Sequence, residues 1–143
     1  MHKIFGNREN AKYLDRVGSY VVPVKDGYVG VVRTPKGYFL IGGGIEGKEN
    51  PKAAIMRECL EETGYTVSLG ELICTAEAYV KHSELGYFHP MQSYYTGVLE
   101  QKVQEPIESD HIFEWVKYEK LKGNMFSQMQ NWAIEQIINS DNI

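Results

Sequence analysis

Cysteine and long apolar runs are scarce in this chain, and both absences exclude classes of protein. The 143 residues include only two cysteines, Cys59 and Cys74, which fit no metal-binding spacing and give no disulfide framework. We expect two reduced and buried thiols. No stretch approaches the roughly 18 apolar residues of a membrane-spanning helix, and residues 1–8 lack the apolar run of a signal peptide. The sequence therefore predicts a cytoplasmic protein with no membrane partner.

An excess of positive charge is also missing. Lysine and arginine total 15 against 19 aspartates and glutamates, which gives a formal net charge of -4. Proteins that bind DNA or RNA rely on positive charge to neutralise phosphates, so no nucleic-acid polymer is expected as a partner. A local basic pocket for a small phosphorylated ligand stays open. Hydrophobic residues at 43% exclude a disordered chain, and the length predicts one domain over residues 1–143.

Turn signals divide the first third of the chain into short strands. Residues 1–17 are polar and mixed, which predicts an arm or a short edge strand. Two valine-rich runs, 20–24 and 29–32, flank Asp26-Gly27, a strong hairpin signal. Pro23 indicates an edge strand or a bulge in the first run. After a turn at 34–37 we expect the following elements: a strand at 38–41, a glycine-rich loop at 42–47, strands at 72–81, 91–100 and 112–116, and a polar aromatic loop at 81–90.

Two helices are expected among these strands. Asn50 is a good N-cap, Pro51 suits the first helical position, and Gly64 is a natural left-handed stop, which predicts a helix over 51–63. A second, amphipathic helix is expected over 126–138, with one apolar face that contains Met129, Trp132, Ala133 and Ile137. Mixed short strands with two helices indicate an α/β or α+β sandwich.

The first helix carries an unusual acidic face. At about 100° per residue, Glu58, Glu61 and Glu62 share one arc, roughly opposite an apolar group formed by Ile55, Met56, Cys59 and Leu60. Each like-charge pair costs roughly 0.2–0.5 kcal/mol, and acids in the last turn oppose the helix dipole by roughly 0.3–1 kcal/mol. A bound divalent cation would offset both penalties, since carboxylates are ligands that Mg²⁺ and Mn²⁺ favour. The alternative is a solvated acidic face.

The spacing around this helix decides between the two interpretations. Gly43, five residues, Glu49, seven residues and then the run from Arg57 to Tyr65 (RECLEETGY) resembles the signature of the Nudix (MutT-like) hydrolase family. Every glycine and charged position of the signature is matched. Cys59 and Tyr65 depart from it, at positions that are usually aliphatic. The strand order around the signature also resembles the family over most of the chain.

The resemblance implies a fold, an activity and a ligand set. The fold would be an α/β/α sandwich with a mixed central sheet. The activity would be cleavage of the diphosphate linkage in nucleoside diphosphate derivatives, such as modified nucleoside triphosphates, dinucleoside polyphosphates or nucleotide sugars. Mg²⁺ or Mn²⁺ would be bound by Glu58, Glu61, Glu62 and the carbonyl of Gly42, while Glu49 and Arg57 would pair to fix the loop on the helix. Family members often form homodimers, so a homodimer stays open.

Other roles are expected with less direct signals. Glu58 is the expected general base, with Glu105 on a later loop as the alternative; an exposed loop glutamate is the plain interpretation of Glu105. Arg16 and Arg33 could contact phosphate, against the alternative of solvated surface arginines. Tyr79 could stack on a nucleobase, and so could Tyr87 and Phe88, although aromatic residues mostly pack in cores. The histidines His82, His89 and His111 show no metal-ligand spacing and are expected in loops or on the surface.

Two other functions compete with the hydrolase. A non-catalytic nucleotide-sensing domain of the same fold is the first alternative, and the intact acidic set argues against it. The second is a structural domain whose glutamates only meet a basic partner. Incubation with nucleotides, with and without Mg²⁺, separates all three.

Overall fold

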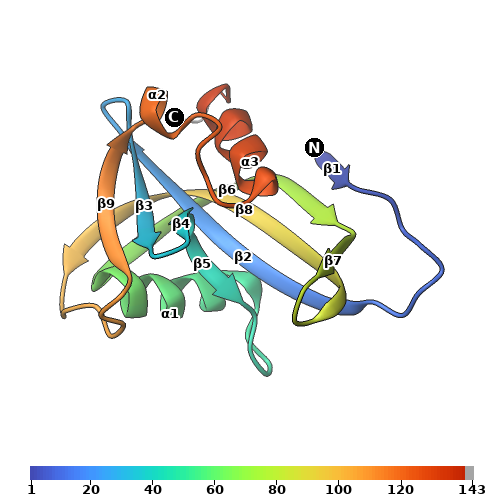
Figure 1. Cartoon of the computed structure of the whole chain (residues 1–143). Coiled ribbons are helices and arrows are strands. Elements are labelled where there is room, and N and C mark those ends of the chain that lie inside the picture. Colours follow the sequence, from blue (N-terminus) through green and yellow to red (C-terminus); the bar gives the residue numbers. More distant parts are fainter. Residues whose placement is uncertain (141–143) are drawn as a thin grey trace.

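The computed structural model describes residues 1–140, in which strands predominate. Figure 1 shows a strongly twisted sheet between two helices that lie on opposite sides of the strands. The elements in chain order are β1 (His2–Phe5), β2 (Leu14–Lys25), β3 (Tyr28–Thr34), β4 (Gly37–Phe39), β5 (Ile41–Gly44), α1 (Pro51–Thr63), β6 (Tyr65–Ala78), β7 (Val80–His82), β8 (Gly86–Lys102), β9 (Ile112–Lys117), α2 (Tyr118–Leu121) and α3 (Gln128–Ile138).

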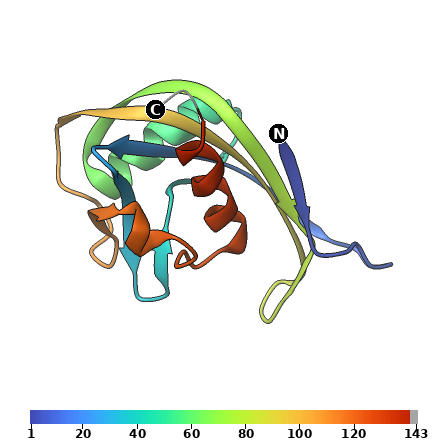
Figure 2. The same ribbon diagram turned by 90° about the horizontal axis from the view of Figure 1, so that it is seen from above.

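The sheet is mixed. Its main path runs β1-β6-β8-β2-β3-β4, while β5 pairs with β2, β7 with β8, and β9 with β3. The pairs β1–β6 and β2–β8 are parallel, and the other pairs are antiparallel. The long strands β6 and β8 run side by side (Figure 2). This arrangement confirms the expected α/β/α sandwich with a mixed central sheet.

Alternation along the strands builds one core on each side of the sheet. On β2, Val21 belongs to the core under α1 with Ile55 and Cys59, whereas Val22 belongs to the core under α3 with Ala133 and Ile137. Successive side chains of a strand point to opposite faces, which explains this division. Both cysteines are free and buried, as expected. No helix within residues 1–140 is long and apolar enough to cross a membrane.

The first helix is confirmed residue for residue. The Asn50 side chain accepts a hydrogen bond from the Ala53 N–H at 2.8 Å, and Gly64 ends the helix with a φ of 79°. A Cβ on Gly64 would lie 1.9 Å from the Gln104 carbonyl oxygen, so only glycine fits this stop. The expected apolar face is wrong at Met56, which is 54% exposed. Packing against the sheet covers Ile55 and Cys59 and leaves Met56 beyond its margin.

The strands are longer and more central than the sequence suggested. The expected edge strand 20–24 is wrong, because β2 pairs with both β8 and β5 in the middle of the sheet. Pro23 lies where β2 leaves β5, after the Val21–Ile41 pair, and joins β3 at the Val24–Val29 pair. A missing N–H is tolerated at such a change of partner.

Two expected loops are also wrong in part. Residues 42–44 of the expected glycine-rich loop belong to β5, and the expected aromatic loop 81–90 contains most of β7 and the start of β8. The expected strand at 112–116 and the expected helix at 126–138 are both confirmed, with ends that differ by at most two residues. The short helix α2 was not expected.

Candidate active site

The site forms where β5 meets the acidic face of α1. The Gly42 N–H donates a hydrogen bond to Glu62 Oε1 at 2.9 Å. A Cβ on Gly43 would lie 2.7 Å from Glu58 Oε2, so this carboxylate lies directly on the strand. The Ser19 hydroxyl on β2 donates to the Pro51 carbonyl at 2.8 Å and fixes the start of the helix. The backbone of β5 therefore lies against two of the three glutamates of the carboxylate cluster (Glu58, Glu61 and Glu62).

Arg57 connects the loop before α1 to this cluster. Its Nε and Nη2 donate to the two carboxylate oxygens of Glu49 at 2.7 and 3.0 Å, in a bidentate pair. Its Nη1 donates to Glu58 Oε1 at 2.5 Å and reaches Glu61 Oε2 at 3.5 Å. Nη2 also donates to the Gly44 carbonyl at 3.2 Å. One guanidinium thus holds the loop, the end of β5 and Glu58 in a fixed arrangement, and the expected Glu49–Arg57 contact is present.

The carboxylate cluster has more negative charge than its protein partners neutralise. Burial raises the pKa of Glu62 to about 8, against the opposing hydrogen bond from Gly42, and the nearby charges of Glu58 and Glu108 add to the rise. Burial also raises the pKa of Glu58 even though Arg57 opposes it. A carboxylate pushed toward its neutral form returns to the ionised form when a cation binds. Hard oxygen donors in excess of positive charge fit a divalent metal ion.

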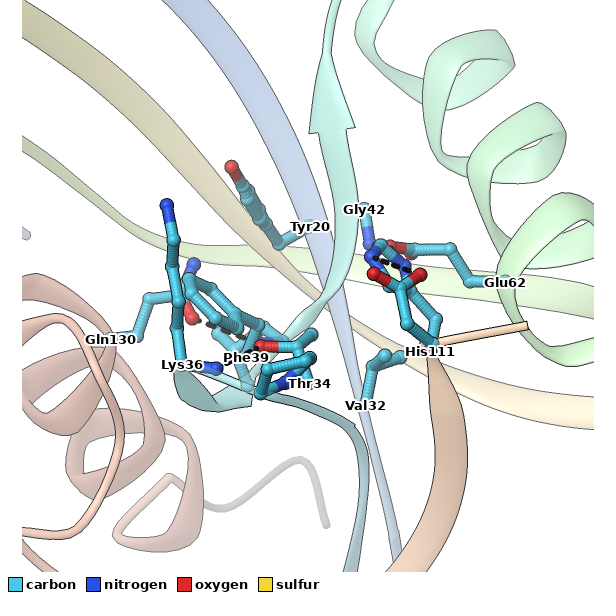
Figure 3. A pocket seen from close by; sticks show the side chains of 12 residues that line it. Tyr20, Val32, Thr34, Lys36, Phe39, Gly42, Glu62, His111 and Gln130 are labelled. Carbon is cyan, nitrogen blue, oxygen red and sulfur yellow. Dashed lines mark hydrogen bonds and ion pairs between the residues drawn. The ribbon is translucent and has the colours of Figure 1, made fainter. Parts of the chain in front are cut away.

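A loop before β9 closes over the C-terminal end of α1. The Ile107 N–H donates to the Glu61 carbonyl at 2.8 Å, and the Val103 N–H donates to the Gly64 carbonyl at 2.9 Å. The loop places His111 beside the cluster, with its Nδ1 3.8 Å from Glu62 Oε2 (Figure 3). This Nδ1 is buried and has no hydrogen-bond partner among residues 1–140.

The other side of the His111 ring faces acids of the same loop. His111 Nε2 lies 3.1 Å from Glu108 Oε2 and 3.8 Å from Asp110 Oδ1. Among residues 1–140, these three side chains also form a group whose ligand atoms could meet at one ion. The expectation that His111 lies in a plain loop is incomplete, because the ring lies 3.8 Å from Glu62 on the acidic face of α1.

A pocket leads from the carboxylates toward α3. Glu62, His111 and Gly42 line one end, while Phe39 and Gln130 line the other (Figure 3). On the far side of β5 a second cavity is lined by Glu58, Gly43 and Arg16. A Cβ on Gly44 would lie 3.0 Å from Arg16 Nη2, so the guanidinium lies over the end of β5. The structure therefore brings Arg16 to the site.

Tyr20 occupies the point where these cavities meet. It lines both of them, and it also lines two further cavities beside Phe88, Pro90 and Gln92. Burial raises the pKa of Tyr20 to about 12; Arg16 opposes the rise, and Glu62 and Glu58 add to it. The phenol therefore stays protonated at neutral pH, and its hydroxyl is available to donate a hydrogen bond to a ligand in these cavities.

Three expected residues lie away from the carboxylates. Glu105 is 83% exposed at its side chain and pairs with Lys102 at 3.3 Å. Arg33 is on the opposite face of β3 from Val32 and Thr34 and donates to Glu114. The Tyr79 ring stacks on His89, with ring centres 4.4 Å apart, and its edge lines a cavity beside α3.

A second charged group lies at the far end of β6, β8 and β2. We name it the histidine cluster: His2, Asp15, Glu77 and His89. The His89 nitrogens lie 2.9 Å from Asp15 Oδ1 and 2.8 Å from Glu77 Oε1. His2 Nε2 lies 2.6 Å from the other Glu77 oxygen. The expectation that His89 is on the surface is wrong, because β8 carries it inward and only 9% of its side chain is exposed.

Several site residues were missed in the sequence. Tyr20 sits in a valine-rich strand and Gln92 in a long strand, where neither carries a motif. Both residues lie outside the signature in the sequence, and only the parallel pairing of β2 with β8 brings them close to each other. The sequence alone therefore does not indicate that they line the same cavities. Glu108 was missed beside Glu105. A weak signal did exist for the loop, because Glu108, Asp110 and His111 are closely spaced ligand types.

Comparisons with known proteins agree with this geometry. A family model described as NUDIX domain matches residues 14–137. A NUDIX hydrolase from Nitrosomonas europaea superposes with a TM-score of 0.74 at 17% identity, over 87% of this chain and 89% of that one. A MutT protein from Methanosarcina mazei Go1 gives 0.73 at 18% identity, over 94% and 100%. A UDP-X diphosphatase gives 0.70 at 19% identity, over 90% and 64%. No curated protein matches the chain.

Proposed function

The chain belongs to the NUDIX family and is a NUDIX-type pyrophosphohydrolase, and from this premise we propose that it hydrolyses the diphosphate linkage of nucleoside diphosphate derivatives with the help of Mg²⁺. The observation that carries the proposal is the carboxylate cluster held against the backbone of β5 at Gly42 and Gly43, at the mouth of two cavities. Mn²⁺ is the alternative ion. The ligand is a small nucleotide, bound by one domain formed from residues 1–143.

Glu58, Glu61, Glu62 and the carbonyl of Gly42 would hold the metal. Their oxygens are ligands of the kind that Mg²⁺ prefers. Burial raises the pKa of Glu62, and a bound cation would stabilise the ionised form of this carboxylate. When bound, the ion neutralises phosphate charge and lowers the pKa of a water molecule. The hydrogen bond from the Gly42 N–H fixes one oxygen of Glu62 and leaves the other free to act as a ligand.

The protein's own groups then position and activate the reactants. Arg57 fixes Glu58 Oε1, so Oε2 is the oxygen that accepts the proton of the attacking water. Arg16 lies over Gly44 in the same cavity as Glu58, where a guanidinium binds a phosphate. Tyr20 lines both cavities, where its protonated hydroxyl would donate a hydrogen bond to the substrate. Glu105 has less support as the base because its carboxylate pairs with Lys102 in solvent.

A nucleotide panel in ¹⁸O-labelled water tests the proposal. Modified nucleoside triphosphates, dinucleoside polyphosphates and nucleotide sugars are incubated with Mg²⁺, with Mn²⁺ and with a chelator, and products are followed by ³¹P NMR. We expect metal-dependent products, and the labelled product identifies the phosphorus that is attacked. Tight binding without turnover would instead support the nucleotide-sensing alternative. If the protein neither binds the nucleotides nor forms products from them, the proposal is overturned. The expected homodimer stays a prediction, which light scattering checks.

A further inference from the structure

An apolar cavity of about 550 Å³ lies between α3 and the strands, next to the proposed active site. Tyr20 and Gln92 connect it to the carboxylate side, because Tyr20 also lines the Glu62 and Glu58 cavities and Gln92 shares a small cavity with Arg16. One wall carries Phe39 and Phe126, whose rings lie 5.1 Å apart and tilt by 31°. A flat aromatic group of the substrate would therefore have a stacking surface within reach of a phosphate held at Arg16.

Two amide side chains form the polar edge of this cavity, and their orientation is fixed by the backbone. The Leu40 N–H donates to Gln130 Oε1 at 2.9 Å, and this contact makes the other end of the Gln130 amide the NH₂ group. Gln130 Nε2 then faces Gln92 Oε1 at 3.5 Å. The Tyr94 hydroxyl donates to the same Gln92 oxygen at 2.6 Å. Gln130 is buried, so water does not compete for these contacts, and the oxygen and NH₂ ends of both amides keep the same orientation.

The consequence is an edge that carries donors alone. Both amide oxygens are occupied as acceptors, by Leu40, Gln130 and Tyr94. The NH₂ group of Gln92 has no such partner among the described hydrogen bonds, and Gln92 is one of the residues that line the cavity. Burial raises the pKa of Tyr94, so its phenol keeps the proton that it donates. A ligand group that faces Gln92 must therefore be a hydrogen-bond acceptor.

We propose that the cavity binds the nucleobase of the substrate and that Gln92 selects bases with a carbonyl group over bases with an amino group. Guanine, hypoxanthine and uracil present an acceptor oxygen at the position where adenine and cytosine present an NH₂ donor. An amino group against the Gln92 amide would leave two donors facing each other without an acceptor. This inference rests on the proposed function for the position of the phosphates. The selection between oxo and amino bases depends only on the Gln92 amide.

Matched nucleotide pairs test the selection. Inosine and adenosine triphosphates differ in the group on C6 and in the proton on N1, and uridine and cytidine triphosphates differ at C4 and N3 in the same sense. We expect the oxo member of each pair to have a kcat/KM at least about tenfold higher. Binding of inosine and adenosine monophosphates by calorimetry measures the same ratio without turnover. If the protein shows no metal-dependent hydrolysis but still binds inosine monophosphate more tightly than adenosine monophosphate, the proposed function is overturned and the selection by Gln92 is supported.

Two variants connect the ratio to the Gln92 amide. Gln92→Glu keeps an oxygen for Tyr94 and Gln130 and replaces the NH₂ group by an acceptor, so the ratio should fall below one. Gln92→Leu removes the donor, so the ratio should approach one. Gln101→Leu, an exposed position on the same strand, is the matched control and should keep the native ratio. Thermal melts show which variants fold; if Gln92→Leu fails to fold, Gln92→Glu decides. Equal use of both members by the native protein, or a native ratio in Gln92→Glu, overturns the inference.

Discussion

The carboxylate cluster on α1 and the histidine cluster at the far end of the sheet both contain acids, yet the carboxylates of the two clusters have different partners. In the histidine cluster each carboxylate faces an imidazole, and hydrogen bonds from His89 and His2 lower the pKa of Glu77. On α1, by contrast, burial raises the pKa values of both Glu58 and Glu62. A group whose carboxylates are hydrogen-bonded within the protein stabilises the fold, while a group of carboxylates left with excess negative charge is suited to an external cation.

The largest expected effect tests the catalytic half of this contrast. Glu58→Gln keeps an oxygen that can accept the hydrogen bond from Arg57 but removes the carboxylate that we propose as the proton acceptor. We expect kcat to fall at least about 10²-fold with little change in the melting temperature. Glu100→Gln, on an exposed position of β8, is the matched control. A near-normal kcat in Glu58→Gln would reassign the base to another acid of the site.

The next effect concerns the charge excess itself. Glu62→Gln should weaken Mg²⁺ binding about tenfold, since one ligand is lost, and calorimetry measures this change. In a chelator it should raise the free energy of unfolding by about 1–3 kcal/mol near pH 7. The sign follows from linkage: the pKa rises from 4.5 in the unfolded chain to about 8 in the fold. The metal-free protein therefore loses stability as pH rises between these values, and the variant should not. An identical pH dependence in both proteins would contradict the assignment.

A smaller change in the histidine cluster should affect stability and spare activity. His89→Ala removes a buried ring that bridges Asp15 and Glu77. We expect the free energy of unfolding to fall by about 1–3 kcal/mol, measured by urea denaturation, with kcat within twofold of the native value. Gln101→Ala, at an exposed position of β8, is the control. A fall in kcat with an unchanged free energy of unfolding would contradict a purely structural role for the histidine cluster.

The smallest effect is an acid-side slope. Because the pKa of Glu77 is lowered in the fold, its contribution to stability is present above its unfolded value of 4.5 and is lost as pH falls through the folded value. Melting temperatures between pH 6 and pH 3 should therefore fall less steeply in Glu77→Gln than in the native protein. Parallel curves would show that this carboxylate is not the one that titrates.

How much the sequence predicts depends on how local the determining contacts are. The helix α1 was correct to the residue because Asn50, Pro51 and Gly64 act within a few residues of its ends. The strands β6 and β8 were cut short because their pairing joins distant segments, including Tyr65 with Lys102. Met56 was misplaced because its burial depends on where the sheet ends rather than on helical periodicity.

The same distinction holds for the candidate site. Glu58, Glu61, Glu62, Arg57 and Glu49 could be predicted because the family signature fixes their spacing in one continuous stretch. Arg16 was a weaker prediction, although β2 places it over Gly44. Tyr20, Gln92 and Gln130 belong to three separate elements, and their contacts arise only after β2, β8 and α3 have assembled. Residues that act together from distant segments carry no common spacing.

The ladder between β2 and β8 has a consequence for how this scaffold changes over time. Arg16, Gly18 and Tyr20 alternate with Val17, Ser19 and Val21, so the first set faces the cavities while Ser19 and Val21 face α1. Inserting or deleting one amino acid between positions 16 and 20 would exchange these two sets. New substrates are therefore reachable through point replacements along this stretch, whereas a change in its length would remove both the Ser19 contact with the helix and the proposed phosphate contact of Arg16.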